Sequence, residues 1–181
     1  MSIAGLSGKS AEKYYYEKDS IFNENGEGEN LNWGGNIASA MGLNDGTPVY
    51  QKDFVSALNG SVGDTPLRDQ SKNTSGDERK AYDLPLSAPK SVSHAGLVLD
   101  KKDVVDAHNE AVKKTMDYVQ SLAQARVYND KGERVKQDTN KILFASATHS
   151  TSRATAGNSP DPSLHTHNVI MNTTQDKDGK F

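Results

Sequence analysis

The chain has 181 residues, of which 25% are charged and 34% are hydrophobic, and its net charge is −3. This length suits one domain or slightly more, and the absence of cysteine excludes disulfides and thiolate metal sites and fits a reducing compartment. The sequence has no apolar run near the roughly 20 residues that span a bilayer and no signal-peptide pattern, so we expect a cytoplasmic protein without membrane insertion. The acidic balance counts mildly against nucleic-acid binding, which usually needs a basic surface.

The first half of the chain mixes short periodic segments with polar loops. The pattern predicts a strand over 2–6 and helices over 10–16, 35–41 and 52–58, the first capped by Ser10 and the second stopped by Gly42. Polar, glycine-containing stretches over 23–32 and 59–80 are predicted as loops, and we expect the longer one to be a mobile surface loop.

The second half carries the clearest elements. A strand over 82–87 precedes a helix that starts near Pro89, and apolar residues at spacings of three, four and seven predict a long helix over 103–126. A turn over 129–134 leads to strands over 141–149 and 165–173, followed by a hairpin turn over 176–179. A further strand would begin at Phe181, so we expect a domain that is incomplete at its C-terminal end.

Three of the five histidines gather in one stretch of the sequence. His165 and His167 alternate in an apolar run typical of a strand, so both imidazoles point to the same face. His149 ends another such run, and a loop between the two runs can bring the strands together as antiparallel neighbours. Three imidazoles on one sheet favour a divalent-metal site with open coordination positions. The alternative is that His165 and His167 are ordinary strand residues and His149 is unrelated to them.

A run of three tyrosines, Tyr14, Tyr15 and Tyr16, lies on the first predicted helix. Neighbouring residues on a helix are about 100° apart, so the three rings cannot all face inward. A tyrosine oxygen is a possible nucleophile when a base or a metal assists it. The alternative is that these rings only cover the core.

Two further residues are candidates for chemistry. Asp83, on the predicted strand over 82–87, is either a surface aspartate or a carboxylate that orients a metal-bound imidazole or accepts a proton. Lys90, in the first turn of the following helix, is a candidate for phosphate contact. His108 has helical spacing from apolar neighbours and is interpreted as a hydrogen-bonded core residue, and His94 is given no role.

Four segments, in this order, resemble the N-terminal part of MobF-type conjugative relaxases, which are HUH endonucleases: WGGNIASAMGL, YDLPLSAPKSVS, VVDAHNEAVKKTMDYVQSLAQARV, and THSTSR followed by DPSLHTHNVIMNTT. The resemblance covers most of residues 1–181. It implies an α+β fold, in which a central antiparallel sheet is flanked by helices in a palm-like arrangement.

The resemblance also implies an activity. Such a protein nicks single-stranded DNA at a plasmid transfer origin by transesterification, leaving a 5′-phosphotyrosine and a free 3′-OH in the bacterial cytoplasm. The implied partners are a hairpin with its nick site and accessory relaxosome proteins, and the implied cofactor is Mg²⁺ or Mn²⁺, with Zn²⁺ as the alternative. The implied site residues are Tyr14 or Tyr15 as nucleophile, Asp83 as the nearby carboxylate, His149, His165 and His167 as metal ligands, and Lys90 and Arg153 as DNA contacts.

Three departures separate the sequence from the family pattern. Ile21 and Phe22 stand where the family usually has a second tyrosine pair. Alignment from the start of the tyrosine run favours Tyr14, whereas alignment from its end favours Tyr15. The loop over 150–164 is longer than the family pattern, which can shift His149 relative to the other two histidines. Two alternatives therefore stay open: a DNA-binding module that has lost catalysis, and a replication-initiator or transposase relative with the same chemistry.

Overall fold

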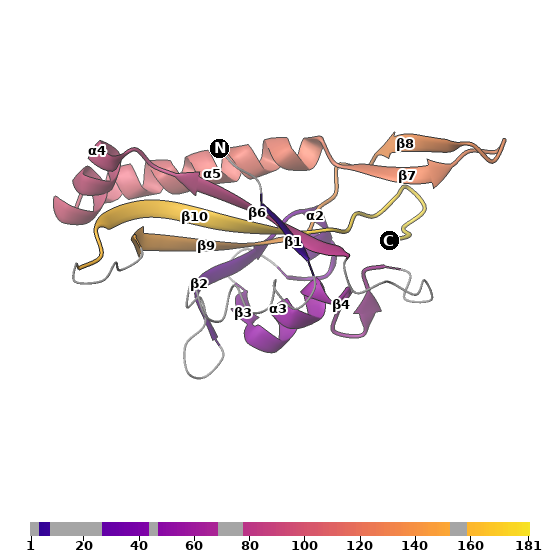
Figure 1. Ribbon diagram of the computed structural model, residues 1–181, viewed down its shortest axis with the longest axis horizontal. Coiled ribbons are helices and arrows are strands. Elements are labelled where there is room, and N and C mark those ends of the chain that lie inside the picture. Colours follow the sequence, from indigo (N-terminus) through magenta and orange to yellow (C-terminus); the bar gives the residue numbers. More distant parts are fainter. Residues whose placement is uncertain (1–3, 8–26, 44–46, 69–77, 153–158) are drawn as a thin grey trace.

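The computed structural model describes residues 4–7, 27–43, 47–68, 78–152 and 159–181. Its centre is a six-stranded antiparallel sheet with the strand order β1–β6–β10–β9–β2–β3 (Figure 1). The strands are β1 Ala4–Ser7, β2 Glu27–Gly34, β3 Pro48–Tyr50, β6 Arg79–Ser87, β9 Phe144–Thr151 and β10 Pro162–Met171. The predicted α+β class with a central antiparallel sheet is confirmed.

Helices flank both faces of this sheet. The long helix α5 runs along one face together with the two short helical segments that precede it in the chain, and the other two short helices lie across the opposite face (Figure 1). The helical segments are α2 Asn36–Ala40, α3 Gln51–Leu58, α4 Lys90–Ser93, the π-helical turn η1 His94–Val98 and α5 Lys102–Ser121. None of the described helices combines the length and the hydrophobicity that a bilayer-spanning segment needs.

Each face of the sheet has its own apolar core. Trp33, Phe54 and Val169 are each at most 2% exposed in the core under α2 and α3. Leu84 and Met116 form the centre of the core under α5. Each fully buried apolar side chain of this size contributes roughly 1.5–3 kcal/mol. Because β9 and β10 contribute to both cores, their alternating side chains can face only one way, and this fixes the strand register.

Helix α5 begins as predicted but ends earlier. The helical spacing of Val112 and Met116 places both in the core, yet the helix stops at Ser121 and the predicted extension to 126 was wrong. The helix ends there because the next residues form a strand: β7 Gln124–Tyr128 pairs residue by residue with β8 Arg134–Asp138, and the predicted turn connects the two. The carbonyl of Ala123 accepts a hydrogen bond from the Thr139 amide at 2.9 Å, which closes the base of this ribbon.

Strand β2 was not predicted, because most of it falls in the stretch interpreted as a polar loop over 23–32. Its signal is the alternation of Leu31 and Trp33, each 2% exposed. These residues pair with Ala147 and Ala145 on β9. The polar residues before and between Leu31 and Trp33 made the stretch look like a loop, because two apolar residues are too few to reveal the alternation of a strand.

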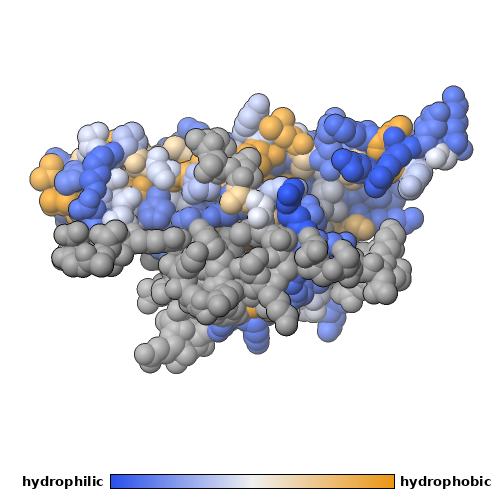
Figure 2. All heavy atoms as spheres, in the orientation of Figure 1, coloured by the Kyte–Doolittle hydropathy of each residue, from blue (hydrophilic) through white to orange (hydrophobic). Residues whose placement is uncertain are grey.

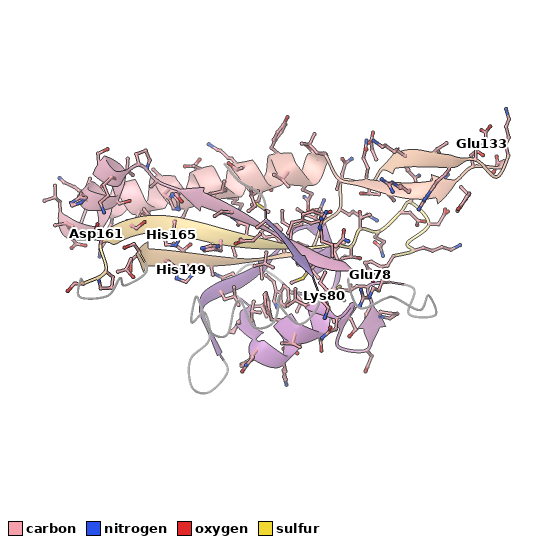
Figure 3. The ribbon with its side chains drawn as sticks, viewed as in Figure 1. Glu78, Lys80, Glu133, His149, Asp161 and His165 are labelled. Atoms are coloured by element: carbon pink, nitrogen blue, oxygen red, sulfur yellow. The ribbon has the colours of Figure 1, made fainter. Side chains whose placement is uncertain are left out.

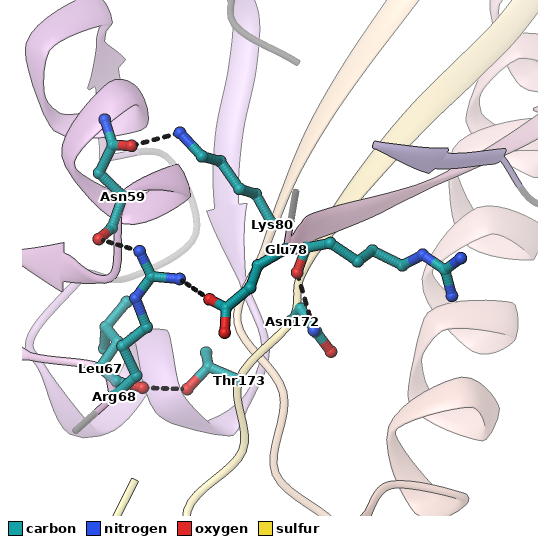
Figure 4. Close-up of polar contacts among 8 residues, drawn as sticks. Asn59, Leu67, Arg68, Glu78, Lys80, Asn172 and Thr173 are labelled. Atoms are coloured by element: carbon teal, nitrogen blue, oxygen red, sulfur yellow. Dashed lines mark hydrogen bonds and ion pairs between the residues drawn. The ribbon is translucent and has the colours of Figure 1, made fainter. Parts of the chain in front are cut away.

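The described part of the predicted loop over 59–80 has structure of its own. Strands β4 Ser61–Val62 and β5 Thr65–Pro66 form a small hairpin, and Figure 4 shows the polar contacts of the residues that flank it with the start of β6 and with the residues after β10. The Arg68 guanidinium donates to the Asn59 carbonyl at 2.7 Å and to the Glu78 carboxylate at 3.2 Å. The mobility expected for this loop stays a prediction.

Candidate metal centre

Three histidine rings meet on the face of the sheet opposite α5. His165 and His167 alternate along β10, and His149 on β9 is the direct ladder partner of His165. The ring centroids lie 5.2 Å apart for His149 and His165, 5.3 Å for His165 and His167, and 5.7 Å for His149 and His167. Figure 3 shows His149 and His165 side by side on their neighbouring strands. The structure therefore brings the three predicted histidines together on one face of the sheet.

Backbone and carboxylate oxygens orient two of these rings. Nδ1 of His167 donates to Oδ2 of Asp83 at 2.9 Å, and Nδ1 of His165 donates to the Ser163 carbonyl at 2.9 Å. A carbonyl and a carboxylate can only accept, so each Nδ1 carries the hydrogen and each Nε2 carries the lone pair. This is the tautomer in which an imidazole binds a metal through Nε2 while an oxygen holds its other nitrogen.

The donor set fits a divalent metal ion. Imidazole nitrogen is a ligand for Zn²⁺ and for other divalent transition metals, and the three rings are half-buried at one end of the sheet. Within the described ranges, no three acidic or histidine side chains already stand in ligand geometry. His149 and His165 stack on each other with 20° between their ring planes, whereas His167 stands edge-on to both.

Asp83 is the carboxylate beside the rings. It lies on β6, is 3% exposed, and pairs in the ladder with Val169, two residues beyond His167. Oδ2 holds His167, whereas Oδ1 is buried and has no hydrogen-bond partner among the described residues. A buried acceptor of this kind normally has a donor, so Asp83 can accept one more hydrogen bond on the histidine side of the sheet.

His108 approaches the same strand from the α5 side. Its Nε2 lies 3.0 Å from Oγ1 of the buried Thr166, which lies 3.0 Å from Oγ1 of Thr148. Burial lowers the pKa of His108 from 6.5, and the nearby charge of His165 lowers it further. The hydrogen bond predicted for His108 is confirmed, but its predicted place in the core is wrong, because the ring is half-buried and belongs to neither core. Its closeness to the cluster was not predicted, because helical spacing says nothing about which strand a helix crosses.

Lys90 lies where α4 meets the start of β10. Its ammonium contacts the Asp161 carboxylate at 3.1 Å and donates to the Pro162 carbonyl at 3.1 Å. The side chains of Lys90 and Asp161 are 55% and 73% exposed, so solvent screens this ion pair. The other predicted site residues, Tyr14, Tyr15 and Arg153, lie outside the described residues, as do Ile21 and Phe22.

Comparisons with known proteins agree with this architecture. A family model described as TrwC relaxase matches residues 6–181. The Multifunctional conjugation protein TraI of Escherichia coli strain K12 is 37% identical over 176 residues, which are 97% of this chain and 10% of TraI. A second Escherichia coli TraI is 36% identical over 169 residues, which are 93% of this chain and 9% of that protein.

Solved structures of the conjugative relaxase TrwC in complex with oriT DNA have the same fold. The metal-free and metal-bound complexes each align with a TM-score of 0.79 over 99% of this chain, at 30% and 31% identity. A third complex, with a 27-mer comprising the recognition hairpin and the cleavage site, also has a TM-score of 0.79, at 30% identity and 99% coverage. The chain spans 58%, 59% and 57% of those three TrwC chains.

Proposed function

The chain belongs to the TrwC relaxase family, the MobF type, and from that premise we propose that it contains the nicking centre of a conjugative relaxase. Its substrate is single-stranded DNA at a transfer origin, presented as a hairpin with an adjacent nick site. The triangle of histidine rings beside Asp83 is the observation that carries the proposal. The solved complexes of TrwC with oriT DNA support the choice of substrate. Residues 1–181 then belong to one relaxase domain that works in the bacterial cytoplasm, with accessory relaxosome proteins as further partners.

We assign His149, His165 and His167 as the residues that hold a divalent metal, Mg²⁺ or Mn²⁺, with Zn²⁺ as the alternative. Metal-bound TrwC supports this assignment. A metal at this position, when bound, polarises the scissile phosphate and stabilises the negative charge that develops on its non-bridging oxygens. The chain's own contribution is orientation: Asp83 and the Ser163 carbonyl hold two of the rings by their Nδ1 hydrogens.

The nucleophile in this proposal is Tyr14 or Tyr15. A tyrosine hydroxyl has an ordinary pKa near 10, so its attack needs a proton acceptor, and Asp83 Oδ1 is buried and unpaired among the described residues. The tyrosine oxygen gives up its proton and forms a bond to phosphorus. The bond from phosphorus to the 3′-oxygen breaks, and that oxygen takes up a proton. The products are a 5′-phosphotyrosine and a 3′-OH, and the phosphodiester energy is conserved for later strand joining.

Lys90 and Arg153 are the residues that we expect to contact the DNA backbone. Lys90 donates to the carbonyl of Pro162, the first residue of β10, which is three residues before His165. Its ion pair with Asp161 is exposed and screened, so a phosphate can replace the carboxylate at low cost.

Mass spectrometry of a covalent adduct tests the proposal. The chain is incubated with a single-stranded oligonucleotide that spans its own transfer origin, with Mg²⁺ or Mn²⁺ and, as a control, with a chelator. We expect a peptide from the tyrosine run that carries a 5′-phosphate and the downstream DNA. Tyr14→Phe and Tyr15→Phe identify the nucleophile, with Tyr118→Phe, an exposed tyrosine on α5, as the matched control. Binding of the hairpin without any adduct would instead favour a DNA-binding module that has lost catalysis.

A further inference from the structure

The ribbon formed by β7 and β8 extends past the C-terminal end of α5, at the opposite end of the molecule from the histidines (Figures 1 and 3). Residues that are directly paired across an antiparallel ladder share a face. The register pairs Arg126 with Lys136 and Tyr128 with Arg134, and all four residues are exposed. One face of the ribbon therefore presents three cations and one aromatic ring, with the hydrogen-bonded pair Gln124 and Asp138 at its base, and Figure 2 shows hydrophilic residues gathered at this end of the molecule.

The stability of the ribbon does not explain these cations. Like charges directly opposite each other destabilise a ladder, and Arg126 faces Lys136 in a chain whose net charge is −3. Within the part of the chain that the structure describes, Arg126, Arg134 and Lys136 form no ion pair and no side-chain hydrogen bond. The nearby acids lie at the ends of the ribbon: Asp138 accepts from Gln124 at the base, and Glu133 accepts from Asn129 at the turn.

The base of the ribbon is anchored, so that its cationic face is held away from the sheet. A two-stranded ribbon is marginally stable by itself. Here the Thr139 amide donates to the Ala123 carbonyl at 2.9 Å, and Oγ1 of Thr139 lies 2.6 Å from Oγ1 of Thr174. At the far end, Tyr128 is 72% exposed, which leaves its ring available to a partner.

We propose that this face of the ribbon, Arg126, Tyr128, Arg134 and Lys136, binds the sugar–phosphate backbone of duplex DNA flanking the nicking centre. The proposal rests on the proposed function. Exposed cations neutralise phosphates and supply sequence-independent affinity for DNA, and the major groove of a duplex admits a two-stranded ribbon. A single strand is a poorer fit, because sequence-independent binding of single strands relies on several stacked rings and this face has one.

The position of the ribbon limits which part of the DNA it can touch. Helix α5 has 20 residues and is therefore about 30 Å long. His108 lies level with the histidines and is the seventh residue of this helix, so about 20 Å of helix separates them from the base of the ribbon, and the ribbon adds roughly 3.3 Å per residue. A duplex rises about 3.4 Å per base pair, so the ribbon meets DNA on the order of six to ten base pairs from the segment bound beside the histidines. The contact is therefore with flanking duplex and not with the bond that is cut.

The salt dependence of duplex binding tests this assignment. Binding of a labelled duplex of about 25 base pairs is measured by fluorescence anisotropy between about 50 and 200 mM salt, where each phosphate contact contributes about 0.9 to the log–log slope. The variant combines Arg126→Gln, Arg134→Gln and Lys136→Gln. A matched control removes the same charge elsewhere with Lys101→Gln, Lys102→Gln and Lys177→Gln. We expect the slope to fall by about 2–3 in the ribbon variant and to fall less in the control.

Single substitutions and adduct formation keep the test independent of folding and of the nicking proposal. Arg126→Gln and Lys136→Gln should each lower the slope by about 0.9, even if the triple variant is poorly folded. The ribbon variant should still form the tyrosine adduct with a single-stranded oligonucleotide; absence of that adduct in the unmodified chain counts against the proposed function alone. Equal slopes for the ribbon and control variants, or no binding of the duplex by the unmodified chain, would overturn the ribbon assignment and leave an acidic protein as the partner to seek.

Discussion

Asp83 and His167 lie on neighbouring strands, and the Asp83 carboxylate accepts a hydrogen bond of 2.9 Å from Nδ1 of the imidazole. Both side chains are shielded from solvent, at 4% exposure for Asp83 and 13% for His167. A negative charge in this position raises the basicity of the other ring nitrogen and fixes the plane of the ring. The contact therefore links the two parts of the proposed centre, the metal ligands and the proton acceptor.

Replacement of Asp83 by asparagine should weaken metal binding. An amide oxygen can still accept from His167, but the negative charge is lost, and loss of such a partner typically costs 10–100-fold in metal affinity. Calorimetric titration of the chain with Mn²⁺ measures the change, with Asp106→Asn, an exposed aspartate on α5, as the control. Unchanged affinity in Asp83→Asn would show that the carboxylate does not support the ligand.

His108 should make the free energy of unfolding depend on pH. Its pKa is lowered in the folded chain from the ordinary value of 6.5, so below pH 6.5 the unfolded chain takes up the proton first. Stability from this group is therefore present above pH 6.5 and decreases as the pH falls. Urea unfolding at pH 7.5 and 5.5 in a chelator should show a smaller decrease for His108→Gln than for the unmodified chain. Equal decreases would mean that other groups cause the effect.

Gly35 should be intolerant of a side chain. Its φ is 95°, and an added Cβ would lie 2.2 Å from the Ile142 carbonyl oxygen, which accepts a hydrogen bond from the Ile37 amide at 3.2 Å. Gly42 is the control, because its φ is 75° but nothing lies within 4 Å of an added Cβ. We expect Gly42→Ala to cost about 1–2 kcal/mol and Gly35→Ala about 3 kcal/mol or more, measured by urea denaturation. If both substitutions lower the free energy of unfolding by the same amount, backbone strain alone explains the loss and the contact with Ile142 contributes nothing.

Lys90 and Asp161 should have opposite effects on DNA binding. The exposed ion pair contributes at most about 1 kcal/mol to stability, so neither substitution should change the unfolding temperature much. Lys90→Gln removes the proposed phosphate contact and should weaken binding of a single-stranded oligonucleotide, whereas Asp161→Asn removes the anion that competes for Lys90 and should strengthen it. Weaker binding in both variants would indicate that the pair is needed for the shape of the loop.

The sequence predicted the elements whose signal is local. Alternation along 165–173 and 141–149 located β10 and β9, and the spacing of Val112 and Met116 located α5. Strand β2 was missed because only Leu31 and Trp33 mark its buried face. The length of α5 was overestimated because the residues after 121 suit a helix as well as a strand. Their pairing with β8, which the local sequence does not reveal, makes them a strand.

Within the candidate site, the sequence identified which histidines would meet but not how they are held. Alternation was sufficient to place His165 and His167 on one face, and the structure adds His149 as the ladder partner of His165. The contacts from Asp83 and His108 depend on which strand and which helix lie next to β10. Such neighbours are decided by packing between segments more than 50 residues apart, as the separations of 58 and 84 residues show.

The register between β9 and β10 has a consequence for how this chain can vary. Thr166 lies between His165 and His167 and points to the α5 side, where it meets His108. A single-residue insertion within β10 would exchange the two sides, sending imidazoles into the apolar contact with α5 and a threonine to the other face. Insertions and deletions should therefore be tolerated between Ser152 and Asp161, where two hydrogen bonds join the ends of the loop. Within β10 they should prevent folding. The same constraint offers a simple guide to alignment of distant relatives: gaps belong in that loop and never in the strand.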